Sequence, residues 1–290
     1  MGAHGPRARP RAWVLNLDAD LELGAGASYT PSKRVLTAMA VKAAPLHALL
    51  DPGDVVVDAT TPAGALSGAL GVAFCPTPRA LAWLRRVGAE PAPHPSVEVL
   101  RLVASRAFGL ALGSALPGAI FTSDAAVVAR VVASTPAVGR GWRLKRAYGM
   151  AGRGHRVVAA GTLSSADAAF VAASGPAGLV VEPEVEIVEE LGLHGVLTPE
   201  GALRHGALVR QTCDAHGAWV STERVTDHLA ASRISEELER AGRALHRVGY
   251  FGPFGIDAFT YRDGARVALQ PRSEINPRYS MGFAVGFLGR

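Results

Sequence analysis

The sequence predicts an α+β protein in which a small α/β domain comes before a larger part that mixes helices with antiparallel strands. Strand and helix patterns alternate up to about residue 95, as expected for a domain built on a parallel sheet. From Ser96 onwards the pattern changes to helices and to paired strand segments joined by glycine-containing turns. The architecture therefore changes near residue 95.

The composition narrows the class of protein. Of the 290 residues, 49% are hydrophobic, which is too many for a disordered chain. The net charge of +5 comes almost entirely from arginine, which a compositional bias explains and which also suits an anionic ligand such as a nucleotide. The longest apolar run, residues 107–121, is interrupted by glycine and proline and is too short to span a bilayer.

A cytoplasmic location is expected from two further features. The basic start of the chain leads into no apolar segment of the kind found in secretory signals. The two cysteines, Cys75 and Cys213, form no motif and suggest no disulfide framework, which fits a reducing compartment.

In the first 95 residues we expect a strand that starts at residue 12 and becomes polar by residue 22, followed by a loop. Ser32 can cap a helix that runs to about Leu50. The apolar run at 54–60 indicates a buried parallel strand, and a helix is expected near 79–88.

The larger part begins with a helical periodicity over 96–113, which the Pro-Gly pair at 117–118 ends. Ser123 and Asp124 can cap a second helix. Two strands, 142–148 and 155–161, are expected to form a hairpin. The remaining predictions are helices over 165–174 and 232–248, and strands over 178–191, 192–197, 206–212, 254–261, 265–270 and 273–276.

The loop of the first hairpin contains three glycines, Gly149, Gly152 and Gly154. Glycine allows backbone N–H groups to approach a ligand, and a run of them can cradle phosphate oxygens. Lys145, on the strand that leads into the loop, is one of very few lysines in this chain and offers a compact charge for a phosphate oxygen. The alternative is an ordinary flexible hairpin tip.

A second candidate segment is VVEPEVEIVEE, residues 180–190. Glu182 ends an apolar strand, and Pro183 favours an extended bend after it. Exposed backbone groups at such a bend can hydrogen-bond the edge of a purine. An ordinary acidic strand end is the alternative, although five glutamates are more than a surface strand needs.

The third candidate joins Asp257 in the segment GIDAF to Glu274 and Asn276 in the segment SEIN. Two carboxylates and an amide from neighbouring strands offer the oxygen ligands that Mg²⁺ prefers. A polar sheet face with salt bridges to nearby arginines is the alternative. Asp257 argues against it, because an unpaired carboxylate in an apolar run is costly to bury.

Taken in order, these segments resemble the ATP-grasp superfamily over roughly residues 96–282. The resemblance implies an ATP-grasp fold of two α+β lobes that clasp ATP. Residues 1–95 would be the preceding Rossmann-like α/β domain, 96–180 the N-terminal lobe with a glycine-rich lid, and 181–290 the C-terminal lobe with the metal site. The E-x-N motif is similar to that of D-alanine–D-alanine ligase, and the Asn-Pro-Arg continuation is closer to carbamoyl-phosphate synthetase and biotin carboxylase.

The resemblance also implies a role for each candidate residue. Those for the nucleotide are Lys145 and Arg106 for the phosphates, Gly149, Gly152 and Gly154 for the lid, Glu182 and the backbone near Val185 for the adenine, and Glu189 or its neighbour Glu190 for the ribose. Mg²⁺ or Mn²⁺ would be held by Asp257, Glu274 and Asn276. Arg278 would face the reacting carboxylate or acyl phosphate.

The sequence departs from the family pattern in three places. A second phosphate-binding lysine is usual on the helix near 98–112, but only Arg101 and Arg106 are available here, and Arg106 is the candidate. Gly255 stands where the D-alanine ligases carry an arginine, so D-alanine is not the expected substrate. The segment between Asp257 and Glu274 is also longer than usual, which could bring Gln270 near the metal.

The implied activity is that of an ATP-dependent ligase, which converts a small-molecule carboxylate to an acyl phosphate, joins it to an amine or similar nucleophile and releases ADP. The arginine in place of the second lysine, and the end of the chain soon after Gly282, motivate an alternative: an ATP-binding sensor or scaffold without ligase chemistry. The sequence identifies no substrate and leaves a homodimer open.

Other motifs are weaker. The basic hairpin with Trp142 and Tyr148 could suit a nucleic acid, but its period-2 pattern fits a folded hairpin better. The GAGAS segment at 24–28 lacks the third glycine of a dinucleotide-binding fingerprint. His194, His205, His216 and His228 fall at no metal-ligand spacing, so we expect them at the surface or with satisfied partners.

Overall fold

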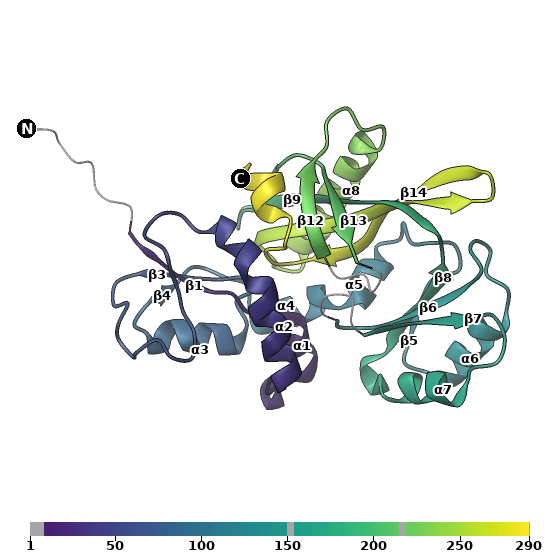
Figure 1. Cartoon of the computed structure of the whole chain (residues 1–290), viewed down its shortest axis with the longest axis horizontal. Helices are drawn as coiled ribbons and strands as arrows, with labels where there is room; N and C mark the ends of the chain where they lie inside the picture. Colours follow the sequence, from purple (N-terminus) through teal and green to yellow (C-terminus); the bar gives the residue numbers. More distant parts are fainter. Residues whose placement is uncertain (1–8, 150–153, 215–218, 290) are drawn as a thin grey trace, which may run out of the picture.

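The structure is a computed structural model of the chain, and it describes residues 9–149, 154–214 and 219–289. Its strands form three sheets, drawn from residues 11–91, 120–184 and 187–276. Figure 1 shows the first sheet on the left, the third at the top and the second at the lower right. None of the helices in the described part of the chain has the length and apolar character that a membrane span requires.

The first sheet is parallel, as predicted, with the order β2-β1-β3-β4. Its strands are β1 (Arg11–Val14), β2 (Val55–Val56), β3 (Leu70–Ala73) and β4 (Glu90–Pro91). The strand predicted over 54–60 shrinks to the two residues of β2, which lies at the sheet edge with Val55 40% exposed. The sequence did not predict β3, because Gly71 interrupts its short apolar run. A Cβ at Gly71 would lie 3.1 Å from Leu84 Cδ1 and 3.2 Å from the carbonyl oxygen of Glu90, which is a tight fit.

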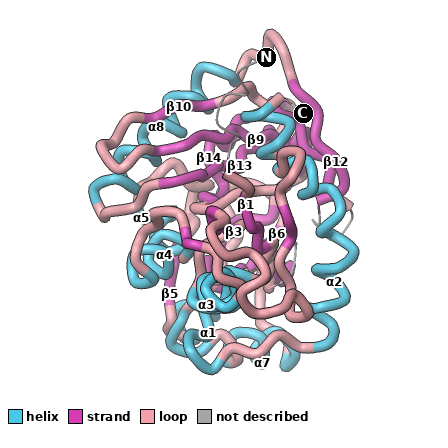
Figure 2. Tube along the Cα trace, turned by 90° about the vertical axis from the view of Figure 1, so that its left-hand side faces the viewer, coloured by secondary structure: helices cyan, strands magenta, loops and turns pink. Residues whose placement is uncertain are grey.

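Helices flank the first sheet. α3 (Pro78–Arg86) begins at the predicted place, with the Thr77 hydroxyl accepting a hydrogen bond from the Ala80 amide. α2 (Lys33–Ala43) is capped by Ser32 as predicted, and the short η2 (Ala44–Leu49) follows it. In Figure 2, where the first sheet faces the viewer, α2 lies along one side of the molecule and α4 along the other.

The prediction of a long strand and a loop over residues 12–32 was wrong. After β1 the chain turns into α1 (Ala19–Ala25) and then η1 (Gly26–Ser28). The acidic residues that made the strand look polar lie at the start of α1, where Arg79 pairs with both Asp18 and Glu22. Tertiary contacts of this kind override the local strand signal.

The second sheet is antiparallel and has the order β5-β8-β6-β7. Its strands are β5 (Ile120–Thr122), β6 (Gly141–Arg146), β7 (His155–Ala159) and β8 (Leu179–Glu184). The predicted hairpin is confirmed as β6 and β7. α6 (Ala125–Ala133), capped by Asp124, and α7 (Ser165–Ala172), capped by Ser164, pack on the buried residues of one face, among them Trp142, Leu144 and Val158.

The burial of Trp142 bears on the nucleic-acid alternative. Its side chain is only 3% exposed, and its indole N–H donates to the carbonyl of Ser134 at 3.0 Å. A ring in this position has no free face on which a base could stack.

β8 does not end at Glu182 but continues to Glu184. Pro183 lies inside the strand, opposite Trp142 of β6, at a point where β5 no longer pairs with β8. The missing N–H of proline is tolerated there because the strand has only one neighbour. The second sheet therefore extends beyond the boundary predicted at residue 180.

The third sheet has the order β12-β11-β9-β13-β14, and β10 also pairs with β9. Its strands are β9 (Ile187–Leu197), β10 (Leu203–His205), β11 (Val209–Cys213), β12 (Trp219–Arg224), β13 (Gly252–Asp263) and β14 (Arg266–Asn276). α8 (Ala231–Arg247) packs on it through Ile234, Leu238, Ala241 and Leu245, the apolar face predicted from the sequence. The short π-helix η4 (Ala284–Leu288) ends the described chain.

The single helix predicted over 96–113 is two helices, α4 (Val97–Ala104) and α5 (Arg106–Ala111). Ser105, with an extended backbone at φ −71° and ψ 133°, ends the first and caps the second through its hydroxyl. α4 packs on the core of the third sheet through Leu100 and Val103, and Figure 1 shows α5 between the second and third sheets.

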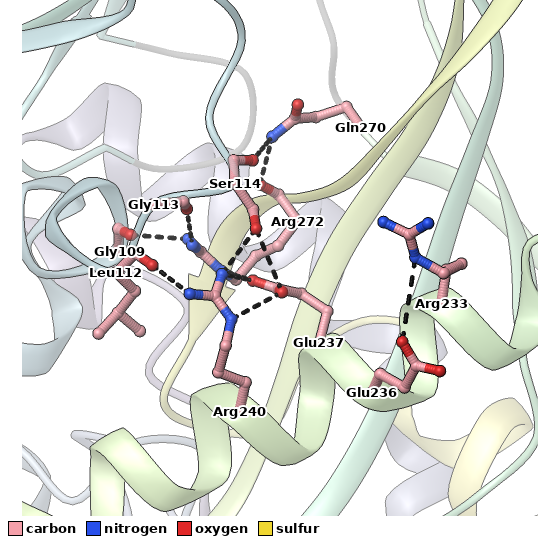
Figure 3. A network of polar contacts seen from close by, with 10 residues as sticks. All are labelled: Gly109, Leu112, Gly113, Ser114, Arg233, Glu236, Glu237, Arg240, Gln270 and Arg272. Atoms are coloured by element: carbon pink, nitrogen blue, oxygen red, sulfur yellow. Dashed lines mark hydrogen bonds and ion pairs between the residues drawn. The ribbon is translucent and has the colours of Figure 1, made fainter.

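A buried ion pair attaches the end of α5 to the third sheet and to α8 (Figure 3). Arg272 of β14 is 3% exposed, and its Nε donates to Glu237 of α8 at 2.6 Å. The same guanidinium donates to the carbonyls of Gly109, at 2.7 Å, and Gly113. Arg240 adds a second contact to Glu237 at 2.6 Å and also donates to the carbonyl of Leu112.

We predict that Glu237→Gln destabilises the protein by about 3 kcal/mol, because it leaves the buried Arg272 charge without its counter-ion. The matched control is Glu236→Gln, on the same helix, whose pair with Arg233 spans 3.9 Å and is 72% and 70% exposed (Figure 3). Loss of that exposed pair should change the free energy of unfolding by less than about 0.5 kcal/mol. Equal urea unfolding curves for the two variants would contradict the prediction.

The same variant has an expected pH dependence. Burial raises the pKa of Glu237, but hydrogen bonds from Arg240 and Arg272 outweigh it and hold the pKa below its ordinary value. The stabilisation by Glu237 is therefore complete above the ordinary glutamate pKa and is lost as the pH falls through the lowered value. The stability difference between the wild type and Glu237→Gln should shrink in acid.

Candidate functional site

A cleft lies between the second and third sheets, with α5 along one side. It encloses about 560 Å³ of space not filled by atoms, including space that is open to solvent. Its lining includes four of the residues that the sequence singled out: Arg106, Lys145, Glu182 and Glu274. Gln270 and Arg272 line it as well, so the network of Figure 3 forms part of its wall.

Charged side chains on the cleft face of the second sheet form two ion pairs. Lys145 Nζ lies 2.6 Å from a carboxylate oxygen of Glu182, and Arg143 Nε lies 2.6 Å from Glu184. Trp142 and Leu144, which alternate with Arg143 and Lys145 along β6, point to the opposite face under α6 and α7. The alternation of side chains along β6 and β8 therefore places Lys145 and Glu182 on the cleft side of the sheet. Lys145 lies on the strand that leads into the glycine loop, as predicted.

Arg106 is the first residue of α5 and reaches across the cleft. Its Nη2 lies 2.8 Å from a carboxylate oxygen of Glu274 on the third sheet, and its Nη1 donates to the carbonyl of Arg146 at 2.7 Å. Its Nε is buried and has no partner in the described part of the chain. The guanidinium thus joins the second sheet to the third and keeps one buried donor free.

The predicted metal ligands lie together on one face of the third sheet. Asp257 of β13 is directly opposite Glu274 of β14, and Asn276 follows two residues later on the same face. The two oxygens of Asp257 accept hydrogen bonds from Asn276 Nδ2 at 2.8 Å and from Gln211 Nε2 at 3.0 Å. An irregularity next to Asp257 places three residues of β14, 271–273, opposite the single residue 258 of β13.

The two carboxylates have opposite pKa shifts. Burial and the nearby charge of Glu274 raise the pKa of Asp257 to about 6, against which the amides of Gln211 and Asn276 act. Burial also raises the pKa of Glu274, but the charges of Arg106, Lys145 and Arg278 outweigh it and lower that pKa. Arg278 also lowers the pKa of Asp257, but it does not outweigh burial and the charge of Glu274.

These residues fit a divalent cation bound by oxygen ligands. Asp257 and Glu274 are adjacent, partly buried carboxylates, and a positive charge between them would relieve the repulsion that raises the pKa of Asp257. The described residues contain no group of three or more histidine, cysteine, aspartate or glutamate side chains that could hold a metal ion. The amide of Asn276 and the phosphates of a nucleotide would have to complete the ligand set.

Arg278, predicted to face the substrate, is held by the first domain. Its Nη2 lies 2.6 Å from a carboxylate oxygen of Asp20 in α1, and its guanidinium stacks on Phe74 at 5.4 Å from the ring centre. The sequence reasoning missed Asp20, because it placed the acidic run of residues 18–22 at the end of a strand. The signal available in the sequence was the group of three acidic residues, Asp18, Asp20 and Glu22, soon after the first strand of an α/β domain.

Glu189 does not lie on the cleft face of the third sheet. It pairs with Arg210 at 2.6 Å and with His228 at 2.9 Å, on the face opposite to Asp257. Its neighbour Glu190 is directly opposite Gln211, the residue that donates to Asp257, and it therefore shares the Asp257 face. Of the two glutamates considered for the ribose, the structure brings Glu190 towards the cleft.

The remaining predicted nucleotide contacts are placed as follows. Val185 is buried in a small core with Leu116, Phe259 and Tyr261, and Phe259 and Leu116 also line the cleft. Gly149 and Gly154 lie at the two ends of the glycine loop, and Gly154 has a φ of +84° that favours glycine. Gly152 lies outside the described residues.

At two positions, one in the first domain and one in the third sheet, close packing leaves no room for a side chain larger than that of glycine. Gly24, in the GAGAS segment, faces the ring of Tyr148, which lies 2.9 Å from where a Cβ would be. Gly255 leaves room for the ring of His194, whose Cδ2 would be 2.8 Å from an added Cβ. The glycine that departs from the D-alanine ligase pattern therefore accommodates a histidine.

The prediction that His194 lies at the surface or has satisfied partners was wrong. Its side chain is 1% exposed, its Nδ1 has no partner among the residues described, and burial lowers its pKa to about 4. His205 is exposed and His228 pairs with Glu189, as expected, while His216 lies outside the described residues.

Comparison with known proteins identifies the fold. Models of protein families and curated protein sequences contain no match to the chain. Among solved structures, D-alanyl-alanine synthetase A from Vibrio cholerae matches with a TM-score of 0.56 and 13% identity, over 92% of this chain and 88% of that one. N5-carboxyaminoimidazole synthetase from Staphylococcus aureus, solved with ADP, matches with a TM-score of 0.54 and 12% identity, over 93% and 70%.

A third match is biotin carboxylase from Campylobacter jejuni, solved as a complex with β-γ-ATP, with a TM-score of 0.55 and 15% identity over 96% of this chain and 61% of that one. These three proteins are ATP-grasp enzymes. Like them, this chain combines a parallel α/β sheet at its start with two antiparallel sheets that face each other across a cleft. The chain therefore has the ATP-grasp fold over almost its whole length.

Proposed function

We propose that this protein is an ATP-dependent ligase that activates a small-molecule carboxylate as an acyl phosphate and joins it to an amine or similar nucleophile. The observation that carries the proposal is the composition of one cleft. Cations from one wall, Lys145 and Arg106, meet carboxylates from the other, Glu274 and its neighbour Asp257. A cleft with these groups suits a nucleotide polyphosphate bound with a divalent cation.

Each phosphate-binding candidate is paired with a carboxylate in the absence of ligand. Lys145 is held by Glu182 and Arg106 by Glu274. A polyphosphate would replace both carboxylates as the anionic partner, which frees Glu182 for the base and Glu274 for a metal ion. On binding, each cation would exchange a carboxylate partner for a phosphate partner and would never be left unpaired. Because Lys145 and Arg106 are already partly buried, binding adds little to the free-energy cost of desolvating them.

The reaction would proceed in two displacements. A substrate carboxylate oxygen forms a bond to the γ-phosphorus while the bond to the bridging oxygen of ADP breaks; the nucleophile then forms a bond to the acyl carbon, inorganic phosphate leaves, and an attacking amine loses a proton. Bound Mg²⁺ would supply charge neutralisation on the phosphates. Lys145 and Arg106 would orient the phosphates, and positioning of this kind is the main protein contribution to phosphoryl transfer.

Arg278 is the candidate for the substrate carboxylate. Its guanidinium is held by Asp20 and Phe74, so its orientation is set before substrate arrives. An arginine whose geometry is already fixed loses little conformational freedom on binding a planar carboxylate.

One observation favours the alternative of a nucleotide-binding module without ligase chemistry. The contact between Arg106 and Glu274, at 2.8 Å, engages a predicted metal ligand with a charge-assisted hydrogen bond. If this pair persists in the presence of nucleotide, Glu274 is not available to a metal ion. ADP release measured across a panel of carboxylates and amines separates the two functions: turnover supports the ligase, and tight ATP binding without turnover under any condition supports the module.

We predict that Glu274→Gln abolishes ATP turnover while the protein stays folded, because an amide is a poor substitute for a carboxylate ligand of Mg²⁺. The control is Glu186→Gln, which removes a carboxylate that is 69% exposed and paired with Arg262. Circular dichroism should be unchanged in both variants. Full turnover by Glu274→Gln would rule out its predicted role.

Arg106→Met should lower kcat/KM for ATP by roughly tenfold to a hundredfold, the usual worth of a hydrogen bond to a charged group. Arg106→Lys restores a charge but not the planar fork, so it should recover part of this loss. Turnover that is unchanged, or higher, in Arg106→Met would show instead that the arginine only blocks Glu274.

A further inference from the structure

His155, to which no role has been given, is paired with Lys145, a residue that lines the cleft. It is the first residue of β7, directly after Gly154, and it lies opposite Lys145 of β6. Directly opposed residues in antiparallel strands share one face, with Cβ atoms roughly 4.5–5.5 Å apart. The position therefore places the imidazole next to a candidate phosphate-binding lysine.

The residues around His155 confirm which face it occupies. Arg156, the next residue, points to the helix side, where it pairs with Asp167 of α7. Val158 is buried in the core under α6 and α7, whereas Val157 is 52% exposed on the opposite side. His155 therefore lies on the cleft face, partly buried, with Lys145 and Arg143.

The charged groups that act on His155 come from three elements. They are Arg143 and Lys145 on β6, Arg106 on α5 and, with the opposite sign, Glu184 on β8. No hydrogen bond or ion pair of the imidazole ring occurs within residues 9–149, 154–214 and 219–289. Burial, and then the three cations, lower the pKa of His155, which favours the neutral ring.

We propose that His155 is a further phosphate-binding residue, and that its ring takes up a proton when a nucleotide polyphosphate enters the cleft. The proposal rests on the ATP site proposed above and adds a proton to its binding reaction. The phosphates bring several negative charges among the same cations that disfavour the charged ring in the free protein. The proton comes from solvent, and the resulting N–H donates to a phosphate oxygen.

The sign of the pH dependence follows from linkage. The pKa of His155 lies below its ordinary value in the free protein and would rise in the complex. Between the two values, binding consumes a proton, so nucleotide affinity increases as the pH falls and levels off below the free-state pKa. A rise of one pKa unit on binding corresponds to a tenfold gain in affinity at the acid end.

The test is calorimetric titration of the full chain with Mg²⁺ and ADP, from about pH 5.5 to about pH 8.5, a range that brackets the ordinary histidine pKa. ADP is used because it is not turned over. The titration of its own phosphates affects both proteins equally, so it cancels in the ratio of their ADP affinities. The wild type should bind roughly tenfold more tightly than His155→Gln at the acid end, and the two should converge at the alkaline end. Titration in buffers of different ionisation enthalpy should show an extra proton taken up only by the wild type.

Two further variants complete the design. His205→Gln removes an exposed imidazole on β10 and should follow the wild type at every pH. His155→Lys carries a charge throughout this pH range, so it should bind ADP tightly up to the alkaline end. Tighter binding cannot result from misfolding, so this variant tests the role of position 155 even if His155→Gln misfolds.

A constant affinity ratio between wild type and His155→Gln across the pH range would overturn the role of His155 and leave the ATP site intact. Absence of ADP binding to the wild type itself would overturn both.

Discussion

The buried contact of Arg272 with Glu237 and with the carbonyls at the end of α5 is the constraint on which the rest of the cleft depends. α5 is only six residues long and could not hold its place by helical stability alone. A guanidinium aimed at its last carbonyls satisfies groups that a helix end leaves unpaired and anchors them to β14 and α8. Because Arg106 begins this helix, the anchor at one end sets the position of the cation at the other.

Most of the charged side chains in the cleft are paired with a side chain of opposite charge. This pairing explains how so many charged groups can be partly buried together. Glu182 and Glu274 each neutralise one cation, and Arg143 pairs with Glu184 on the same sheet face. Asp257 is the exception, since its neighbours are amides and another carboxylate. Among the described residues, the adjacent carboxylates of Asp257 and Glu274 are therefore where we expect a cation.

The sequence predicted those parts of the site that depend on the period of a single strand. Lys145 could be assigned to the cleft, and Asp257, Glu274 and Asn276 to one face, because alternation along a strand decides the direction of each side chain.

Glu189 shows the limit of this reasoning. A shift of one residue moves a side chain to the other face, and the face was decided by pairing with β11 and β13, which local sequence does not specify. Asp20 and Gln211 were missed for a related reason, since their partners lie far away in the chain. The break at Ser105 and the helix α1 were missed because tertiary contacts overrode local propensity.

The pair formed by Asp20 and Arg278 joins positions 258 residues apart, so the two ends of the chain meet at the site. Closing so long a loop costs entropy that only the last contacts repay, and contacts of this kind form late in folding. During synthesis, the first domain emerges from the ribosome long before Arg278 exists. Asp20 must then remain solvated, or find a temporary partner, until the segment that carries Arg278 has been synthesised. Arg278, the residue proposed to bind the substrate carboxylate, is thus also a residue that joins the first domain to the third sheet.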